Sequence, residues 1–214
     1  MPLTFPRDLP FELTNRQPFE PVYQQTQAIT GGGSVNAAEV GDMLWRGIFE
    51  TKTLDRARFN AWVAWGQSLR GGLRLFRGRP PGHRWPIAHP RGFAGVLYLG
   101  SQWSGLGNLS VIGAGRDTVT INQIPNGITL SPGDAFSIPV GSRQHFHRIT
   151  EGATSASNAV SLSIEPPIMP GVSTGIAARI DTPWCDMVLE NGVFSARREG
   201  RGGSISFAGL QVLL

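Results

Sequence analysis

The pattern of hydrophobic and polar positions indicates one helix within a mainly β protein. Between residues 53 and 72, TLDRARFNAWVAWGQSLRGG, apolar side chains recur at spacings of three and four residues, which places them on one face of an α-helix. We therefore expect a helix over about residues 54–70, with one apolar face buried. The apolar positions are Leu54, Ala57, Ala61, Trp62, Trp65 and Leu69, and we expect Leu54, Trp62, Trp65 and Leu69 to form its core contacts.

Both ends of this stretch carry residues that are typical of helix boundaries. Thr53 is a suitable N-cap, and Asp55 would place a negative charge in the first turn, near the positive end of the helix dipole. Gly71 and Gly72 can supply the left-handed residue that closes a last turn.

The rest of the chain favours short strands separated by turns. The 214 residues include 28 Gly and 16 Pro, and only 16% of residues are charged, which favours turns and strands over helices. Alternation predicts strands at 42–51 and 73–76, on either side of the helix, and at 96–99, 109–112, 118–121, 135–138, 145–149, 160–164, 175–180, 186–190 and 204–207. We expect a β-sandwich or split barrel with one packed α-helix and an extended N-terminal arm.

Shifts in composition suggest three regions. Residues 1–36 contain five prolines and three consecutive glycines, and they predict an extended arm of the kind that reaches a neighbouring subunit. Residues 37–90 form the predicted strand, helix and strand. Residues 91–214 follow a Pro-rich connection and are rich in predicted strands, although all three regions fit within one domain of 214 residues.

Charge and cysteine content narrow the classes of function. The net charge of +4 comes from eighteen Arg and one Lys, and most Arg are scattered, which argues against nucleic-acid recognition. Five Arg cluster in sequence, at Arg70, Arg74, Arg77, Arg79 and Arg84.

Cys185 is alone, so we expect a buried thiol and no internal disulfide. No stretch approaches the roughly 18 apolar residues of a membrane span, and no signal sequence is evident, so we expect no membrane insertion.

One segment carries residue types that suit metal chemistry. His145 and His147 lie two apart on a predicted strand, and Glu151 follows, which is the His-x-His-x-x-x-Glu spacing of cupins. In the competing interpretation, Phe146 and Ile149 face the core while the histidines and Arg148 face solvent or a subunit. We favour the interpretation without a metal, and expect no catalytic, cofactor-binding or metal-binding residues. A cupin-like metal enzyme or sugar-binding module using the two histidines and Glu151 stays as the alternative.

The order of features resembles the distal tail proteins of long-tailed, siphovirus-type phages and of phage-derived gene transfer agents. Residues 43–76, MLWRGIFETKTLDRARFNAWVAWGQSLRGGLRLF, look like the strand, helix and strand of that family's ring-forming region. Further similar pieces are Gly133-Asp134, His147-Arg148-Ile149, Glu165-Pro166-Pro167 and the stretch from Pro183 to Leu189.

The resemblance implies a structural virion protein rather than an enzyme. Such a protein forms a hexameric ring at the tail tip, between the tail tube protein and the tail-tip hub or baseplate, and lines the passage for DNA and the tape-measure protein. It is made in the host bacterial cytoplasm and resides in the virion. Because phosphates would bind clustered Arg and slow DNA, we expect the Arg of residues 70–84 to face outward or to contact a partner.

Overall fold

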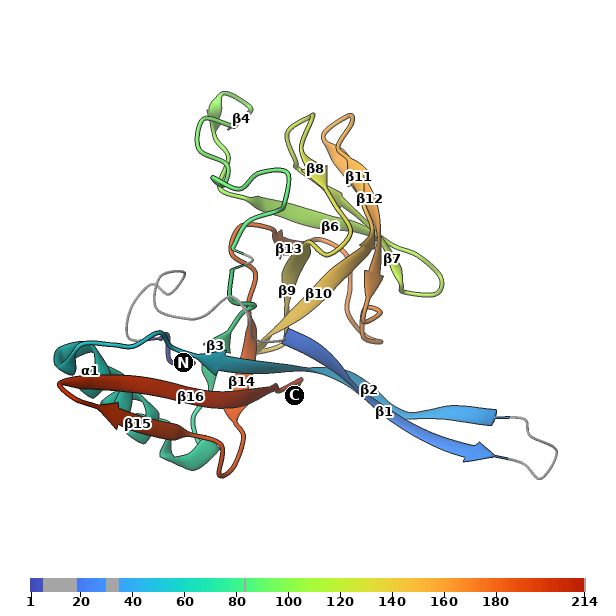
Figure 1. The fold of residues 1–214 in the computed structure, drawn as a ribbon. Helices are drawn as coiled ribbons and strands as arrows, with labels where there is room; N and C mark the ends of the chain where they lie inside the picture. Colours follow the sequence, from blue (N-terminus) through green and yellow to red (C-terminus); the bar gives the residue numbers. More distant parts are fainter. Residues whose placement is uncertain (6–18, 30–34, 83, 214) are drawn as a thin grey trace.

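Two lobes of antiparallel β-strands make up the computed structural model, which describes residues 1–5, 19–29, 35–82 and 84–213 (Figure 1). One lobe is an open sheet covered by the helix, and the other is a closed barrel. The prediction of a mainly β chain with one packed α-helix is confirmed. The parts of the predicted arm at residues 6–18 and 30–34 lie outside the described residues.

The open sheet has the strand order β1-β2-β16-β14-β3, with β15 paired to β16. Its strands come from both halves of the chain, so the C-terminal strands return to the lobe that contains the helix. In β2, buried Met43, Trp45 and Phe49 alternate with more accessible neighbours, as expected for a strand with one covered face. The bounds are β1 Phe19–Ile29, β2 Val35–Glu50, β3 Phe76–Gly78, β14 Cys185–Leu189, β15 Ser195–Glu199 and β16 Gly202–Gln211.

Helix α1 spans Arg56–Ser68 and begins later than the sequence suggested. Its N-cap is Asp55, whose Oδ1 accepts a hydrogen bond from the Arg58 backbone N–H at 2.9 Å. The expectation that Thr53 is the N-cap was therefore wrong. The reason is tertiary, because Leu54 is held in an isolated β-bridge with Gly203 and its N–H donates to the Gly203 carbonyl at 2.8 Å. The chain therefore stays extended through residue 54.

The end of the helix matches the prediction. A short 3₁₀ turn, η1 Arg70–Gly72, follows Leu69, and Gly71 has a φ of 64° in the left-handed region. A side chain with a Cβ is disfavoured in that conformation, so glycine suits the position.

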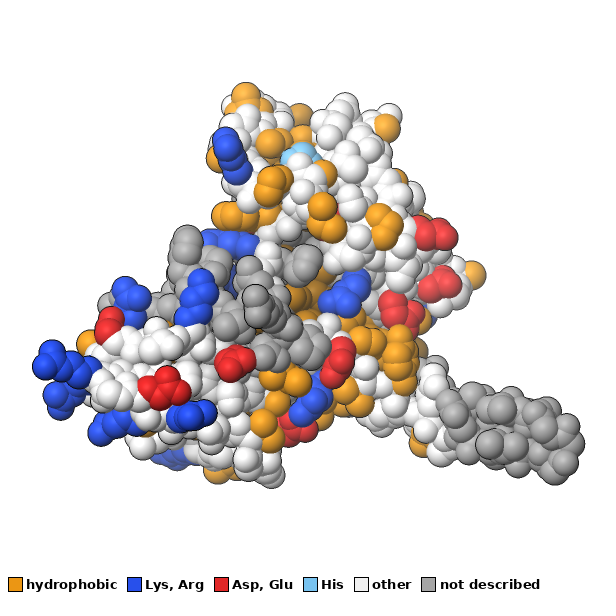
Figure 2. Space-filling view, viewed as in Figure 1, with side chains coloured by type: hydrophobic (Ala, Val, Ile, Leu, Met, Phe, Trp, Pro, Cys, Tyr) orange, Lys and Arg blue, Asp and Glu red, His pale blue; other side chains and the backbone are white. Residues whose placement is uncertain are grey.

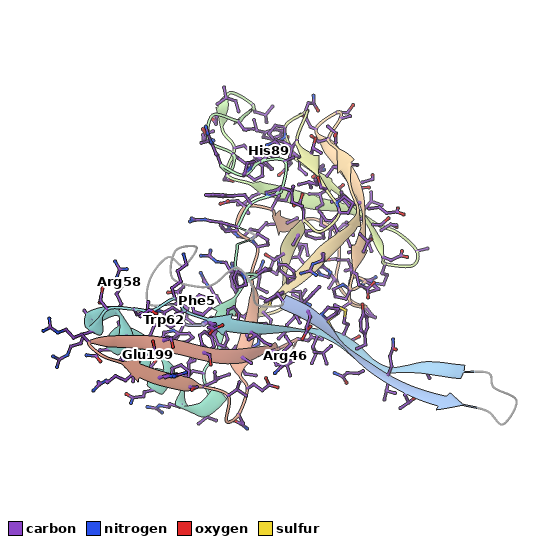
Figure 3. The ribbon with its side chains drawn as sticks, viewed as in Figure 1. Phe5, Arg46, Arg58, Trp62, His89 and Glu199 are labelled. Atoms are coloured by element: carbon purple, nitrogen blue, oxygen red, sulfur yellow. The ribbon has the colours of Figure 1, made fainter. Side chains whose placement is uncertain are left out.

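The buried face of α1 contains most of the predicted core residues. Leu54, Trp62, Trp65 and Leu69 are all buried, as expected. Ala57 and Ala61 are exposed, so the predicted stripe was wrong at both positions, and buried Phe59 replaces them. Figure 3 shows Trp62 beside Phe5, and their ring centroids are 5.7 Å apart. Further aromatic contacts in this cluster join Trp62 to Trp65 and both tryptophans to Phe207.

The barrel closes in the strand order β10-β12-β7-β6-β13-β9. Its interior is a second hydrophobic core, separate from the cluster under the helix, and Leu109, Ile121 and Phe136 are fully buried in it. The barrel strands are β6 Leu106–Ile112, β7 Thr118–Asn122, β9 Ala135–Val140, β10 Arg143–Glu151, β12 Ala159–Glu165 and β13 Ile176–Arg179. Two short pairs lie outside it, β4 Leu97–Tyr98 with β5 Ser101–Gln102, and β8 Thr129–Leu130 with β11 Ala153–Thr154.

Some predicted strands differ from the observed ones. The strand expected at 73–76 begins only at Phe76, because η1 and the turn after it occupy the preceding residues. The strand expected at 96–99 is only Leu97–Tyr98. Strand β1 and the first two residues of β2 lie where the pattern indicated only an extended arm, and β2 begins before the strand expected at 42–51.

An aromatic cluster joins the two lobes. Phe146 of β10 has its side chain outside the barrel, and its ring centroid lies 5.1 Å from that of Phe19 and 5.3 Å from that of Trp45. The Trp45 Nε1–H donates to the Phe146 carbonyl at 2.8 Å. Arg148 lies 4.7 Å from the Trp45 ring centroid and donates to the Phe19 carbonyl at 3.0 Å. The base of the β1–β2 hairpin is thus bound to the barrel.

Replacement of Trp62 tests the helix-to-sheet core. Trp62→Ala is expected to lower the free energy of unfolding by about 3–5 kcal/mol, because a large buried aromatic ring is removed. Denaturant unfolding would measure this change, with the exposed Gln67→Ala on the same helix as control, expected within about 0.5 kcal/mol of the parent. A Trp62→Ala variant as stable as the control would contradict the core assignment.

Candidate functional site

The most prominent surface feature is the distal part of the β1–β2 hairpin, here called the ribbon and comprising residues 23–29 and 35–41. Its strands pair with each other from Gln24↔Gly41 to Ile29↔Val35. Strand β16 pairs with β2 only from Arg46 to Glu50, so no described strand continues the sheet along the ribbon. Figure 1 shows the ribbon pointing away from both lobes.

The ribbon exposes apolar side chains along with both of its backbone edges. Tyr23 is 50% exposed and Val40 is 67% exposed. A two-stranded hairpin is marginally stable by itself in water, and unpaired strand edges readily pair with another chain. The register also shifts between Val22 and Gln24 and again before Gln25, and such bulges increase the local twist. A ribbon of this kind is suited to contact a second protein surface.

The two histidines of the alternative metal site are buried, on the inner face of the barrel. His145 is 2% exposed and His147 is 1% exposed. The expectation that they face solvent or a subunit was therefore wrong as regards solvent. Their register partners in β9 are Ile138 and Phe136, and the His147 ring stacks on Phe136 at 5.4 Å. Phe146 and Ile149 are buried as expected, but in different cores.

Each imidazole contacts a backbone carbonyl. His147 Nδ1 lies 2.8 Å from the Pro166 oxygen and His145 Nε2 lies 3.0 Å from the Leu213 oxygen, and both nitrogens donate, because a carbonyl oxygen only accepts. Both residues line a cavity of about 230 Å³ that Met43 and Met169 also line. His147 Nε2 is buried and has no hydrogen-bond donor among the described residues.

Burial favours the neutral form of both histidines. It lowers the pKa of His147 to about 4, against a smaller opposing effect of the Pro166 carbonyl. Burial also lowers the pKa of His145, although the Leu213 carbonyl and the carboxylates of Asp186 and Asp42 oppose it.

Glu151 does not join these histidines. It is exposed at the end of β10, and its Oε2 accepts a hydrogen bond from Ser163 Oγ at 2.9 Å. Within the part of the chain that the structure describes, no group of three or more His, Cys, Asp and Glu residues is placed to hold a metal ion. Strand alternation correctly placed the histidines on one face, but Glu151 lies apart from them.

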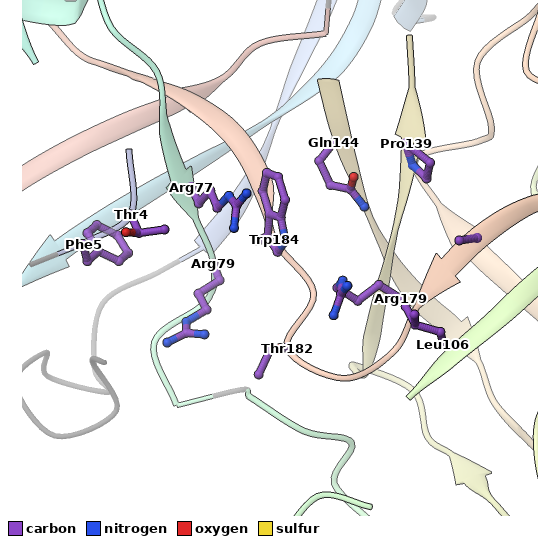
Figure 4. A pocket seen from close by; sticks show the side chains of 11 residues that line it. Thr4, Phe5, Arg77, Arg79, Leu106, Pro139, Gln144, Arg179, Thr182 and Trp184 are labelled. Carbon is purple, nitrogen blue, oxygen red and sulfur yellow. The ribbon is translucent and has the colours of Figure 1, made fainter. Parts of the chain in front are cut away.

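A second, larger cavity of about 710 Å³ lies where the barrel meets the open sheet, and we call it the basic cleft. Arg77 and Arg79 enter it from β3 and the residue after it, and Arg179 enters from β13 (Figure 4). Gln144 and Trp184 also line it. Arg77 and Arg79 belong to the Arg cluster that is visible in the sequence, whereas Gln144, Arg179 and Trp184 are far apart in sequence and belong to no local motif.

Aromatic and polar contacts position the groups of the basic cleft. The Arg77 guanidinium lies 4.3 Å from the Trp184 ring centroid, within the range of a cation–π interaction. The side-chain amide of Gln144 donates to Ser137 Oγ at 3.2 Å. The backbone N–H of Gln144 donates to Asp186 Oδ2 at 3.0 Å. Burial raises the pKa of Asp186, while the Gln144 N–H and the charges of Arg143, Arg77 and His145 oppose that shift.

The other predicted residues have structural or surface positions. Arg70 and Arg74 are exposed, and the Arg84 guanidinium lies 4.9 Å from the Trp85 ring centroid. On the face drawn in Figure 2, most Lys and Arg side chains lie over the lobe of the sheet and helix. Cys185 is fully buried as expected, and burial raises the pKa of its thiol.

Comparisons with known proteins give no match, either to models of protein families or to curated proteins. In the described residues, α1 is too short and too polar to be a membrane-spanning helix. The ribbon, the histidine cavity and the basic cleft are therefore the features of the described chain that bear on function.

The burial of His147 predicts a dependence of stability on pH. Because its pKa is about 4 in the folded chain and about 6.5 when unfolded, the unfolded chain binds more protons between these values. The free energy of unfolding should therefore fall as pH decreases from about 6.5 to about 4, by at most roughly 1.4 kcal/mol per pH unit from this group.

A non-titrating variant isolates that contribution. His147→Asn retains an amide donor for the Pro166 carbonyl, so denaturant unfolding at several pH values should give a shallower acid slope than the parent, whatever its overall stability. Equal slopes in parent and variant would show that His147 does not titrate differently in the folded and unfolded chains.

Proposed function

We propose that this chain is a structural subunit of a tail-tip ring, of the distal tail protein type. The ribbon carries the proposal, because it extends from the body with exposed Tyr23 and Val40 and with edges that no described strand pairs. The seven described residues of its second strand alone span roughly 20 Å. In such a ring, each ribbon lies on the next subunit.

Ring closure follows from a contact of this geometry. A ribbon on one side of the body and its receiving surface on another make a heterologous contact, which closes into a ring when the rotation between neighbours divides a full turn. Six subunits would enclose a channel for DNA and the tape-measure protein, with the tail tube protein on one side and the tail-tip hub on the other. The proposed location is the tail tip of the virion.

The firm anchorage of the ribbon supports this role. Phe19 and Trp45 stack at 5.6 Å at the base of the hairpin, and the Phe146 ring packs on both. Arg46 of β2 also forms a half-buried ion pair with Glu190 at 2.9 Å. A rigid base reduces the conformational entropy that is lost when the ribbon binds a neighbour.

Light scattering over a range of protein concentrations tests this proposal. The parent should have a mass of roughly six times the 23.1 kDa chain. The double variant Tyr23→Asp, Val40→Asp should shift the mass to that of a monomer, because it places charges on the apolar contact surface. Its melting temperature should stay close to that of the parent, since both side chains are exposed.

A matched control places the same charge elsewhere. Leu99, which is 86% exposed and lies outside the ribbon, should tolerate Leu99→Asp with the mass of the parent unchanged. A parent that stays monomeric at all concentrations would contradict a self-assembling ring. A double variant with the parent's mass would contradict the role of the ribbon.

A further inference from the structure

We propose that the basic cleft binds a small, multiply charged oxyanion, either a phosphate ester or a polycarboxylate. This site is independent of the ribbon and of the ring. Its volume of about 710 Å³ lies within the range of small-molecule sites. Three guanidinium groups, those of Arg77, Arg79 and Arg179, line it, and its described lining contains no Asp or Glu.

The charge of the cleft favours an anion with more than one negative charge. Asp186 is the register partner of Arg77 in the β14–β3 pair, and their charges interact, so Asp186 offsets part of the positive potential of the cleft. Arg179, on the facing wall, adds a second guanidinium to that of Arg77, and the described lining holds no Asp or Glu. A single carboxylate ligand would leave positive charge uncompensated in a concave site, where electrostatic fields are focused.

The geometry of the arginines suits oxyanion recognition. Arg77 is held against Trp184 at 4.3 Å, and its Nε is buried with no acceptor among the described residues. Arg179 approaches from the opposite wall, on the barrel, and the Gln144 amide lies on the same side (Figure 4). A guanidinium binds phosphate or carboxylate oxygens through two parallel N–H donors, so groups from two walls can hold one anion between them.

Isothermal titration calorimetry at low salt tests the proposal, with pyrophosphate and citrate as separate probes. At least one probe should bind the parent with a stoichiometry of one per chain. The probe that binds more tightly indicates whether the ligand is a phosphate ester or a polycarboxylate. Arg179→Gln should weaken that affinity by about tenfold or more, because charge-assisted hydrogen bonds are lost. Arg179→Lys retains the charge but not the two parallel donors, and it should fall between the parent and Arg179→Gln.

Two controls keep the result interpretable. Arg74→Gln removes the same charge from an exposed position outside the cleft, and it should bind within about twofold of the parent. Arg179 is preferred to Arg77 for substitution because Arg77 also packs on Trp184, and a thermal melt should show that Arg179→Gln is folded. Absence of saturable binding by both probes, or equal weakening in Arg74→Gln and Arg179→Gln, would overturn the proposal.

Discussion

The packing of Phe146 against Phe19 and Trp45 is the contact on which the rest of the arrangement depends. It takes one residue from the outer face of the barrel and buries it in the core of the open sheet. Since aromatic side chains of this size bury large apolar areas, the contact fixes the two lobes against each other. The same contact fixes the base of the ribbon, and the walls of the basic cleft come from both lobes.

This junction links the proposed assembly role to the architecture. A ring subunit needs a fixed angle between the segment that reaches out and the body that receives the neighbouring segment, and the junction holds β1 and β2 to the barrel at that point. The two histidines lie on the inner face of β10, and the cavity that they line is also bounded by Met43 and Leu213 of the other lobe. They therefore contribute to the fold, and the titration of His147 acts on stability.

Local periodicity predicted the helix and its buried tryptophans, because a 3.6-residue pattern is readable within one segment. It missed the cap at Asp55, since the bridge between Leu54 and Gly203 joins residues about 150 apart. Alternation placed the two histidines on one face, but whether that face is covered depends on barrel closure. The basic cleft was not predicted either, because Arg77 and Arg179 line one cavity only once the sheet and the barrel have packed together.

In the proposed ring, the ribbon of each subunit lies on its neighbour. Electron microscopy of the purified protein, with class averages along the ring axis, would show this contact. The proposed assembly predicts closed rings with six-fold symmetry in which density for each ribbon, residues 23–29 and 35–41, crosses onto the adjacent body. Particles with ribbons free in solvent, or rings joined through other surfaces, would contradict it.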